Sequence, residues 1–326
     1  MWLLVGGSGF IGTNFARFLL ENNYSFRIYD KQKSKYLPKN VETIIGDVRD
    51  KNKLSEAMKG CGTVFHLVTV PPSIKITKEE IYDIDVNGTQ NVLLSAIEND
   101  VEKVIFTSSA SHVYGLVKNN SCPLQENSTL NPINEYGRNK VVAEDLCKKA
   151  TEKSILQTIV LRLSMVLGPY NFDPILIENM KSILRNKRVI IPGDGRSRGQ
   201  SVHVQDVNSA LLKSAEKTNT SLSKHEIINI SGEEILTLDE YIELLRNVTG
   251  ATSKIIHLPL PLAKSMAYIG WRMNKTNVHP SYLSLMAQDQ YFDIRKAKNI
   301  LDWQPKYTIK KAMEDTIAFF KKDGCF

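Results

Sequence analysis

The sequence has few cysteines and no long apolar run. Its four cysteines, Cys61, Cys122, Cys147 and Cys325, form no close pair and lack the spacing of metal ligands, which is typical of a reduced protein without a metal site. The first apolar run, residues 2–5, is too short for the core of a signal peptide, and no stretch approaches the roughly 18 apolar residues that span a membrane. We therefore expect a soluble, cytoplasmic protein without a membrane partner.

Charge is not concentrated in any segment either. Hydrophobic residues make up 42% and charged residues 24% of the 326 positions, as in ordinary globular proteins, and this length suits about two domains. The net charge is +7, but Lys and Arg are spread along the whole chain. This spread favours a solvated basic surface over nucleic-acid binding, and a basic channel for an anionic ligand is the alternative.

The first twelve residues, MWLLVGGSGFIG, contain the strongest local signal. The short apolar run predicts a buried parallel strand, and Gly6, Gly9 and Gly12 follow at three-residue intervals. A glycine turn that leads into a helix suits a pyrophosphate, because backbone can approach the ligand and free helix N–H groups favour its negative charge. The spacing differs from the strict G-x-G-x-x-G fingerprint, so this pattern is weak by itself.

An acidic residue follows at the place where a dinucleotide fold holds a ribose. Asp30 ends the second predicted strand, about twenty positions after the glycines, where a carboxylate accepts ribose hydroxyls and repels a 2′-phosphate. This position favours NAD over NADP. Lys31, Lys33 and Lys35 come just afterwards and could instead bind a phosphate, and a turn residue is the structural alternative for Asp30.

Strands and helices alternate regularly through the first half of the chain. This rhythm predicts an α/β fold, a Rossmann-type doubly wound parallel sheet that binds ligands at the carboxyl ends of its strands. Beyond Gly168 the rhythm loosens, so we expect an NAD-binding domain over residues 1–167 and a smaller α/β C-terminal substrate lobe over 168–326, with some chain crossing back. Strands are expected at 2–5, 26–29, 41–45, 64–68, 104–106, 155–163, 189–191, 200–204 and 227–230, and helices at 13–21, 54–58, 81–97, 134–150, 175–185, 207–215, 238–248 and 310–320.

Tyr136 and Lys140 lie four residues apart near the start of a predicted helix and so share one face. Ser109 lies in the hydroxyl-rich stretch after the fifth strand, at the expected ligand edge. Proton transfer by tyrosine near neutral pH requires a pKa about three units below 10, and a neighbouring ammonium favours that change. Taken singly, the tyrosine is better explained as a packed aromatic and the lysine as a surface charge. Together with the glycine turn, the three residues predict an acid–base site.

The chain resembles the extended short-chain dehydrogenase/reductases of the NAD-dependent epimerase/dehydratase family, sugar-nucleotide type. The resemblance covers nearly the whole chain and is carried by motifs in the family's order: GGSGFIG, GDVRD, HLV, VNGTQNVL, FTSSASHVYG, YGRNK, LRLSMVLGP, GDGRSRGQSVHVQDV and YFDIRKAKNILDWQPKYT.

The resemblance implies that Ser109, Tyr136 and Lys140 carry catalysis, and it also implies a homodimer. The cofactor residues that we expect are Gly6, Gly9, Phe10, Ile11, Gly12, Asp30, Lys31, Asp47, Val48, Leu67, Val68, Thr107, Tyr136 and Lys140. The expected substrate residues are Ser111, His112, Asn171 and Arg198.

Departures from the family pattern decide between reactions. Ala110 and Ser111 stand where sugar dehydratases of this family have an Asp-Glu pair, and related fucose synthases have cysteine at the place of Ala110. Met165 replaces an asparagine that is common in sugar-nucleotide epimerases. The leading hypothesis is an NAD-dependent epimerase acting at C4 of a nucleoside-diphosphate hexose. A hydroxysteroid-like or other NAD(P)-dependent alcohol dehydrogenase, a sugar-nucleotide dehydratase and a non-catalytic dinucleotide-binding scaffold are the alternatives.

Several further residues have simpler explanations than a role in binding or catalysis. His112 looks like one extra residue in the serine loop, and a shaping or hydrogen-bonding role is favoured over a proton carrier. Asp206 and Asp293 each precede a helical pattern and are predicted helix N-caps. Met266, Trp271 and Met273 are spaced like a helix face, for which packing is the default and an apolar substrate pocket the alternative.

Overall fold

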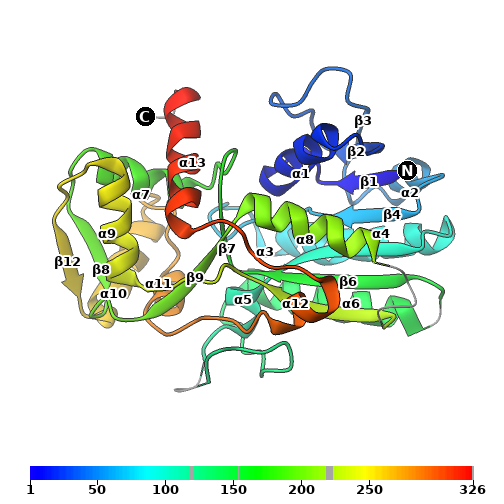
Figure 1. Ribbon diagram of the computed structural model, residues 1–326. Helices are drawn as coiled ribbons and strands as arrows, with labels where there is room; N and C mark the ends of the chain where they lie inside the picture. The colour runs from blue at the N-terminus through cyan, green and yellow to red at the C-terminus, as the bar shows by residue number, and fades with distance from the viewer. Residues whose placement is uncertain (118–120, 153, 218–222, 325–326) are drawn as a thin grey trace.

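The computed structural model describes residues 1–117, 121–152, 154–217 and 223–324 and consists of a large parallel sheet beside a smaller lobe (Figure 1). The strand order is β10-β6-β5-β4-β1-β2-β3, and every neighbouring pair is parallel. The predicted doubly wound sheet is confirmed. Its strands are β1 (Trp2–Val5), β2 (Phe26–Asp30), β3 (Thr43–Ile45), β4 (Thr63–His66), β5 (Lys103–Ser109), β6 (Gln157–Leu163) and β10 (His225–Ile230).

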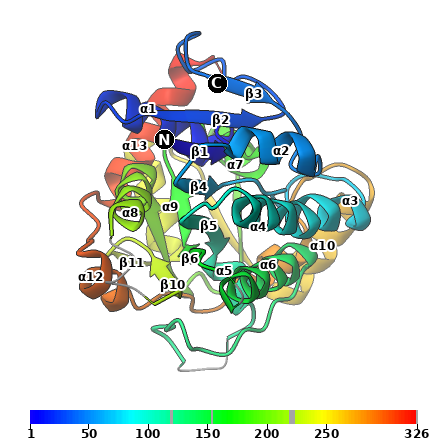
Figure 2. The same ribbon diagram turned by 90° about the vertical axis from the view of Figure 1, so that its right-hand side faces the viewer.

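Helices cover both faces of this sheet (Figure 2). Successive residues of a strand point to opposite faces, so Leu4 packs in one hydrophobic cluster while Leu3 and Val5 pack in the other. One face carries α1 (Phe10–Glu21), α8 (Val204–Glu216) and α12 (Arg295–Leu301), and the other carries α2 (Lys51–Met58), α4 (Gly88–Glu98) and α6 (Glu135–Glu152). Burial on both faces explains why the strands are apolar throughout rather than alternating.

The C-terminal lobe has its own core of Leu167, Met180, Ile183, Leu245 and Phe320, among others. Two small sheets, ordered β11-β9-β7 and β12-β8, lie between its helices. Their strands are β7 (Met165–Leu167), β8 (Val189–Pro192), β9 (Arg198–His203), β11 (Ile235–Thr237) and β12 (Ile255–Leu258), and the helices are α7 (Pro174–Leu184), α9 (Leu238–Thr249), α10 (Leu260–Arg272), α11 (Pro280–Met286) and α13 (Ile309–Lys322). The chain crosses back to the large sheet through α8 and β10, which both pack there.

Both predicted N-caps are wrong. Helix α8 begins earlier than its apolar pattern suggests and is capped by the His203 imidazole, which accepts from the Gln205 N–H. Asp206 lies within the first turn and accepts from the Lys306 and Tyr307 N–H groups, so it fastens a distant loop. Asp293 lies one residue before the cap position of α12, but its carboxylate still accepts from the Arg295 N–H at 2.9 Å and also pairs with the Arg295 guanidinium.

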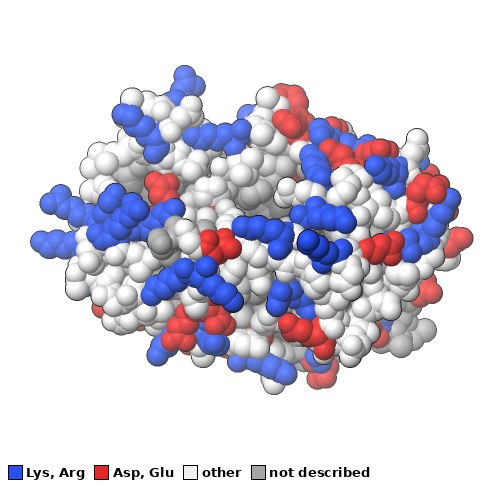
Figure 3. All heavy atoms as spheres, turned by 90° about the horizontal axis from the view of Figure 1, so that it is seen from above, with Lys and Arg blue, Asp and Glu red and all other residues white. Residues whose placement is uncertain are grey.

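The described residues contain three free cysteines, Cys61, Cys122 and Cys147, whereas Cys325 lies outside them. Within the same ranges no group of three or more His, Cys, Asp or Glu side chains is placed to hold a metal ion. Among the helices described, none combines the length and the apolar character needed to cross a bilayer. Lys and Arg gather on the left of Figure 3, over the C-terminal lobe, whereas the right of that view mixes both signs.

A buried ion pair joins the elements that surround the centre of the large sheet. Arg162 of β6 and Glu144 of α6 lie 2.7 Å apart with side chains 2% and 5% exposed. Ser108 of β5 donates to the same carboxylate, and the guanidinium also reaches the Tyr114 hydroxyl at 3.0 Å on α5 (Ala110–Tyr114). A buried charge is tolerated only when it is paired and hydrogen-bonded, so these contacts fix α6 against β5 and β6.

Glu144→Gln is expected to lower the free energy of unfolding by about 3–5 kcal/mol, because the Arg162 charge would stay buried without a counter-ion. The matched control lies on the same helix. Asp145 pairs with Lys149 at 2.6 Å in solvent, so Asp145→Asn should cost less than about 1 kcal/mol. Urea unfolding of both variants measures the difference, and equal losses would show that the buried pair has no special weight.

Candidate active site

The glycine turn after β1 is packed so closely that side chains are excluded from it. Gly6 has φ +88°, and a Cβ there would lie 2.8 Å from the Val68 backbone nitrogen. A Cβ on Gly12 would meet the Gly6 carbonyl oxygen at 2.3 Å. Gly7, which the motif did not single out, is equally restricted, since its Cβ would lie 2.8 Å from an Ile28 side-chain carbon.

This turn leads directly into the N-terminus of α1. Phe10 and Ile11 are its first residues, and the cap residue Gly9 supplies no side-chain hydrogen bond to them. Backbone N–H groups at such an end are available to a ligand, and the helix dipole favours an anion there. The turn and the helix start therefore have the geometry that a phosphate cradle requires, and binding of the pyrophosphate here stays a prediction.

Asp30 closes the cradle from the end of β2. Its carboxylate accepts from the Ser8 N–H at 3.0 Å and from the Gln32 N–H at 3.3 Å. Burial raises the pKa of Asp30, and these backbone donors oppose that change. The carboxylate thus stands at the glycine turn, where a 2′-phosphate would meet a negative charge.

Two of the three lysines that could have favoured such a phosphate have acidic partners. Lys31 lies 3.1 Å from Asp47, and Lys35 lies 3.6 Å from Asp323. Arg49 also pairs with Asp47 at 2.6 Å and holds the pKa of that carboxyl well below its usual range.

The remaining predicted cofactor residues line the same edge of the sheet. Val48 is buried, and it packs so close to Gly88 that a Cβ there would lie 2.6 Å away. Leu67 and Val68 directly follow β4, and Thr107 is buried near the end of β5. Since the carboxyl ends of parallel strands share one edge, the structure brings all of these positions beside the glycine turn.

Ser109, Tyr136 and Lys140 meet at this edge, joined through two neighbours. The Ser109 hydroxyl lies 3.1 Å from His112 Nδ1, and the His112 and Tyr136 ring centroids are 4.8 Å apart. Lys140 Nζ donates to the Thr107 carbonyl at 2.9 Å and lies 5.8 Å from the Tyr136 ring centroid. The geometry is that of an acid–base group, and the catalytic roles themselves stay predictions.

The electrostatics of Tyr136 differ from the expectation that Lys140 lowers its pKa. Burial raises the pKa of Tyr136, and the Asp85 carboxylate raises it further. Burial also lowers the pKa of Lys140, which Asp85 opposes. The ammonium points to the Thr107 carbonyl and is offset by Asp85, so the protein alone favours a neutral tyrosine hydroxyl.

His112 is neutral near physiological pH. Burial lowers its pKa to about 4, and its Nε2 is buried without a hydrogen-bond partner. The imidazole can therefore orient the Ser109 hydroxyl, which supports the hydrogen-bonding role over that of a proton carrier.

A buried polar layer that the sequence analysis missed lies behind this group. Asp85 belongs to a π-helical turn, Asp83–Asn87, and accepts from the Val70 N–H at 3.0 Å, while its Oδ2 has no partner. The Thr89 hydroxyl donates to the Asp85 carbonyl at 2.6 Å, so His66 Nε2, 2.9 Å from that hydroxyl, is the donor in their contact. The only sequence signal was the motif VNGTQNVL, which begins directly after Asp85 and contains Thr89.

A cavity of about 490 Å³ extends from Ser109 into the C-terminal lobe. All four predicted substrate residues line it: Ser111, His112, Asn171 and Arg198. The Arg198 guanidinium donates two hydrogen bonds to Asp289 Oδ2, from Nη2 at 2.5 Å and from Nε at 3.0 Å. The Asn171 side chain donates to the Val166 carbonyl and accepts from the Asp173 N–H. A ligand would therefore meet an Arg198 that is already oriented and partly neutralised.

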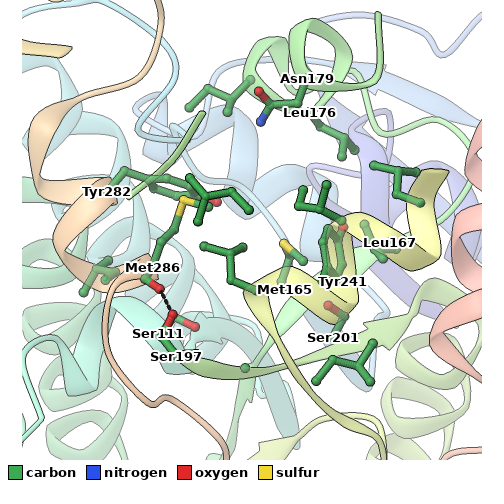
Figure 4. A pocket seen from close by; sticks show the side chains of 18 of the residues that line it. Ser111, Met165, Leu167, Leu176, Asn179, Ser197, Ser201, Tyr241, Tyr282 and Met286 are labelled. Carbon is green, nitrogen blue, oxygen red and sulfur yellow. Dashed lines mark hydrogen bonds between the residues drawn. The ribbon is translucent and has the colours of Figure 1, made fainter. Parts of the chain in front are cut away.

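Most of the cavity wall is apolar and comes from several elements of the lobe. Figure 4 shows Leu176 of α7, Met165 of β7, Tyr241 of α9, and Tyr282 and Met286 of α11 around the space. Ser197 closes one side by donating to the Met286 carbonyl at 2.6 Å (Figure 4). The sequence pointed to Met165 through its motif, whereas Leu176, Tyr241, Tyr282 and Met286 were not predicted, because they lie on elements whose mutual packing leaves no local pattern.

The fold and this edge define a dinucleotide-binding α/β protein. The model of the NAD dependent epimerase/dehydratase family matches residues 2–231, and the chain belongs to that family. Family members of this kind are NAD-dependent enzymes, as the sequence resemblance implied.

Relatives that are named for an activity align with 82–99% of the chain. A putative UDP-glucose 4-epimerase of Methanocaldococcus jannaschii is 28% identical, and the alignment covers 99% of each protein. An N-acetyl-alpha-D-glucosaminyl-diphospho-ditrans,octacis-undecaprenol 4-epimerase of Escherichia coli is 28% identical over 82% of this chain and 77% of its own length. The crystal structure of a Thermotoga maritima UDP-glucose 4-epimerase with UDP-glucose has 25% identity, a TM-score of 0.81 and 99% coverage of both chains.

The residues present fit NAD. The excluded Cβ positions at Gly6 and Gly12 leave backbone free to meet a pyrophosphate, and Asp30 suits ribose hydroxyls. Lys140 and Tyr136 lie at the same edge and are the residues that would meet the nicotinamide end. The bound cofactor would supply hydride acceptance, which no side chain of the protein can provide.

Gly12→Ala is expected to weaken NAD binding at least about tenfold, since the new Cβ would displace the Gly6 carbonyl and the cradle with it. Gly62→Ala is the matched control, because a Cβ at Gly62 meets nothing within 4 Å. Calorimetric titration with NAD, alongside circular dichroism as a check on folding, measures the effect. An unchanged affinity in folded Gly12→Ala would remove the cradle assignment.

A pH dependence of stability follows from His66. Burial lowers its pKa to about 3 in the folded protein, against about 6.5 unfolded. The unfolded chain therefore takes up a proton first, so stability is present above the unfolded pKa and is lost as pH falls below it. Between about pH 7 and pH 4.5 this contribution is about 2 kcal/mol.

The His66→Gln variant keeps a hydrogen-bond donor toward Thr89 but has no imidazole to titrate. Its free energy of unfolding should therefore fall by about 2 kcal/mol less than that of wild type over that pH interval. Urea unfolding at both pH values measures this. His257→Gln, on the surface, should behave like wild type within about 1 kcal/mol. An acid sensitivity of His66→Gln equal to that of wild type would contradict the assignment.

Proposed function

We propose that the protein is an NAD-dependent sugar-nucleotide epimerase that inverts C4 of a nucleoside-diphosphate hexose. The observation that carries this proposal is the meeting of Ser109, Tyr136 and Lys140 at the glycine-turn edge, directly beside a cavity that is large enough for a sugar. The 4-epimerases among the relatives, which align over nearly the whole chain, support the same reaction.

Each of the three side chains has a separate role in the proposed reaction. Ser109 would donate a hydrogen bond to the reacting sugar oxygen, and Tyr136 would take the proton of that hydroxyl and later return it. Lys140 would hold the ribose and place positive charge near the tyrosine. Because the keto sugar must present its other face before hydride returns, a roomy cavity next to Ser109 suits epimerisation better than a tight one.

Other reactions find less support. The cavity edge at Ala110 and Ser111 lacks the carboxylate pair that a dehydratase of this family would use to remove water. An apolar alcohol would suit the cavity wall, which keeps a dehydrogenase as an alternative. Because a dehydrogenase consumes NAD with each turnover, product analysis decides between the two reactions. An intact Ser109, Tyr136 and Lys140 set speaks against a non-catalytic scaffold.

A second candidate substrate is a sugar carried on a lipid diphosphate. The specific observation is the apolar wall of the cavity, formed by residues such as Met165, Leu176 and Met286, together with the relative named for a diphospho-undecaprenol sugar. The chemistry at the sugar would be the same. Only the group beyond the diphosphate would differ.

We also propose a homodimer in the cytoplasm. Helices α4 and α6 pack side by side and expose Leu94, Ile97 and Val142, which supports a face for a second copy. Light scattering of the purified protein tests this part.

Tyr136→Phe is expected to lower kcat for epimerisation at least about a hundredfold while NAD binding is kept, because only the proton-transferring hydroxyl is removed. The assay offers UDP-glucose, UDP-galactose and their N-acetylated counterparts and follows epimer formation and NADH. The control is Tyr82→Phe, which alters a tyrosine that is 46% exposed to solvent. Full activity in Tyr136→Phe, or stoichiometric NADH release by wild type, would overturn the proposal.

A further inference from the structure

Helix α10 presents apolar side chains to solvent. Its only buried residue is Ala263. Leu262, Met266, Ile269 and Met273 follow one another at helical spacing and so form one stripe along the helix, yet they are 50%, 49%, 58% and 55% exposed. Tyr268, next to the stripe, is 55% exposed. A helix that covered the core would bury such a stripe, so this one is turned outward.

The charged residues of the segment that contains this stripe have one sign. Between Glu243 and Asp289 the sequence has no Asp or Glu. Lys264, Arg272 and Lys275 are exposed on or just beyond the helix. We call these three cations together with Leu262, Met266, Tyr268, Ile269 and Met273 the α10 surface.

A further cation is held against this helix. Lys75 Nζ lies 4.4 Å from the Trp271 ring centroid and donates to the Asn274 side chain at 3.0 Å. It comes from a different part of the chain and adds positive charge at the same end of α10. The tryptophan, partly buried, and the exposed Tyr268 are residue types enriched where protein meets the lipid interface.

Helix α10 is connected to the cavity wall through α11. Helix α10 packs on α11, and Trp271 meets His279, which caps α11, with ring centroids 5.1 Å apart. Tyr282 and Met286 on the same short helix line the cavity. Ser73, two residues before Lys75, donates to Asp173 of the cavity wall at 2.6 Å.

We propose that the α10 surface docks on a bilayer that contains anionic phospholipid. An outward apolar stripe bordered by cations, with aromatic residues beside it, is the arrangement of helices that lie in the lipid interface. Lys and Arg near an anionic surface each add attraction. The docked helix lies parallel to the bilayer and does not cross it.

A second copy of the chain fits this surface less well than a bilayer does. In a two-fold contact the same patch meets itself, so the cations of one copy would face those of the other without any carboxylate between Glu243 and Asp289 to pair with them. Anionic lipid headgroups supply that negative charge. The docking does not depend on the proposed reaction, because it rests on residues outside the Ser109, Tyr136 and Lys140 group.

Sedimentation with vesicles tests the proposal on the full-length protein. Vesicles of phosphatidylglycerol and phosphatidylcholine in equal parts are expected to carry the protein into the pellet, and vesicles of phosphatidylcholine alone are expected to carry at least about tenfold less. Added salt should weaken the binding to the mixed vesicles, since the attraction of exposed charges is screened.

Two variants separate the apolar and the charged parts. The double variant Met266→Asp/Ile269→Asp should lower binding to the mixed vesicles at least about tenfold by placing charge in the stripe. Lys264→Gln/Arg272→Gln should lower it as well and reduce its dependence on salt. Ile155→Asp, at an apolar side chain that is 73% exposed elsewhere, is the control and should bind like wild type.

NAD binding and turnover of soluble UDP-sugars are measured on the same samples, so a loss of activity is kept apart from a loss of docking. Failure of the wild type to sediment with mixed vesicles would overturn the proposal, as would equal binding of the Met266→Asp/Ile269→Asp variant. Light scattering compares the molecular mass of the wild-type protein with that of this variant. A smaller oligomer for the variant would also overturn the proposal, because the surface would then be a contact with a second copy.

Discussion

The Arg162–Glu144 pair is the interaction on which the rest of the site depends. It joins β6 to α6 in the interior, and Ser108 and Tyr114 complete its hydrogen bonds from β5 and α5. Breaking such a pair leaves a buried charge without a partner, so the elements that it joins cannot shift separately at small cost. Tyr136 and Lys140 lie on the same helix as Glu144, and Ser109 directly follows Ser108. The pair therefore holds the predicted catalytic group in register.

Around that fixed group the chain separates two environments. On the Rossmann side, close backbone packing at the glycine turn and the Asp30 carboxylate prepare a polar cradle for a dinucleotide. On the lobe side, apolar side chains from α7, α9 and α11 enclose the cavity, and the polar groups that line it include Ser109 and Arg198. Oriented polar groups within a mostly apolar wall are typical of sites that bind small molecules.

Burial governs the protonation of this region. It raises the pKa values of Tyr136 and Asp85 and lowers those of Lys140 and His66. All four changes disfavour charge, as desolvation requires. Within the described residues the Asp85 carboxylate and the Lys140 ammonium oppose each other's burial effect, so the group is balanced rather than strongly polarised before a ligand arrives. A cationic nicotinamide would tilt that balance toward the phenolate, the direction that proton abstraction needs.

The sequence by itself determined the parallel sheet, the glycine turn and the meeting of Ser109, Tyr136 and Lys140. These depend on patterns that can be read along the chain: the alternation of strands and helices, the backbone φ that glycine allows, and the spacing of about four residues that places Tyr136 and Lys140 on one helix face. Residues 10–21 and 157–163 formed close to where the pattern predicted them. The predicted N-caps at Asp206 and Asp293 show the limit of local sequence patterns. The Asp206 carboxylate accepts from a loop about a hundred residues away, and the Asp293 carboxylate pairs with Arg295. Only the tertiary structure decided the cavity wall, the Asp85 layer and the outward face of α10, because each arises from packing between segments that no sequence spacing relates.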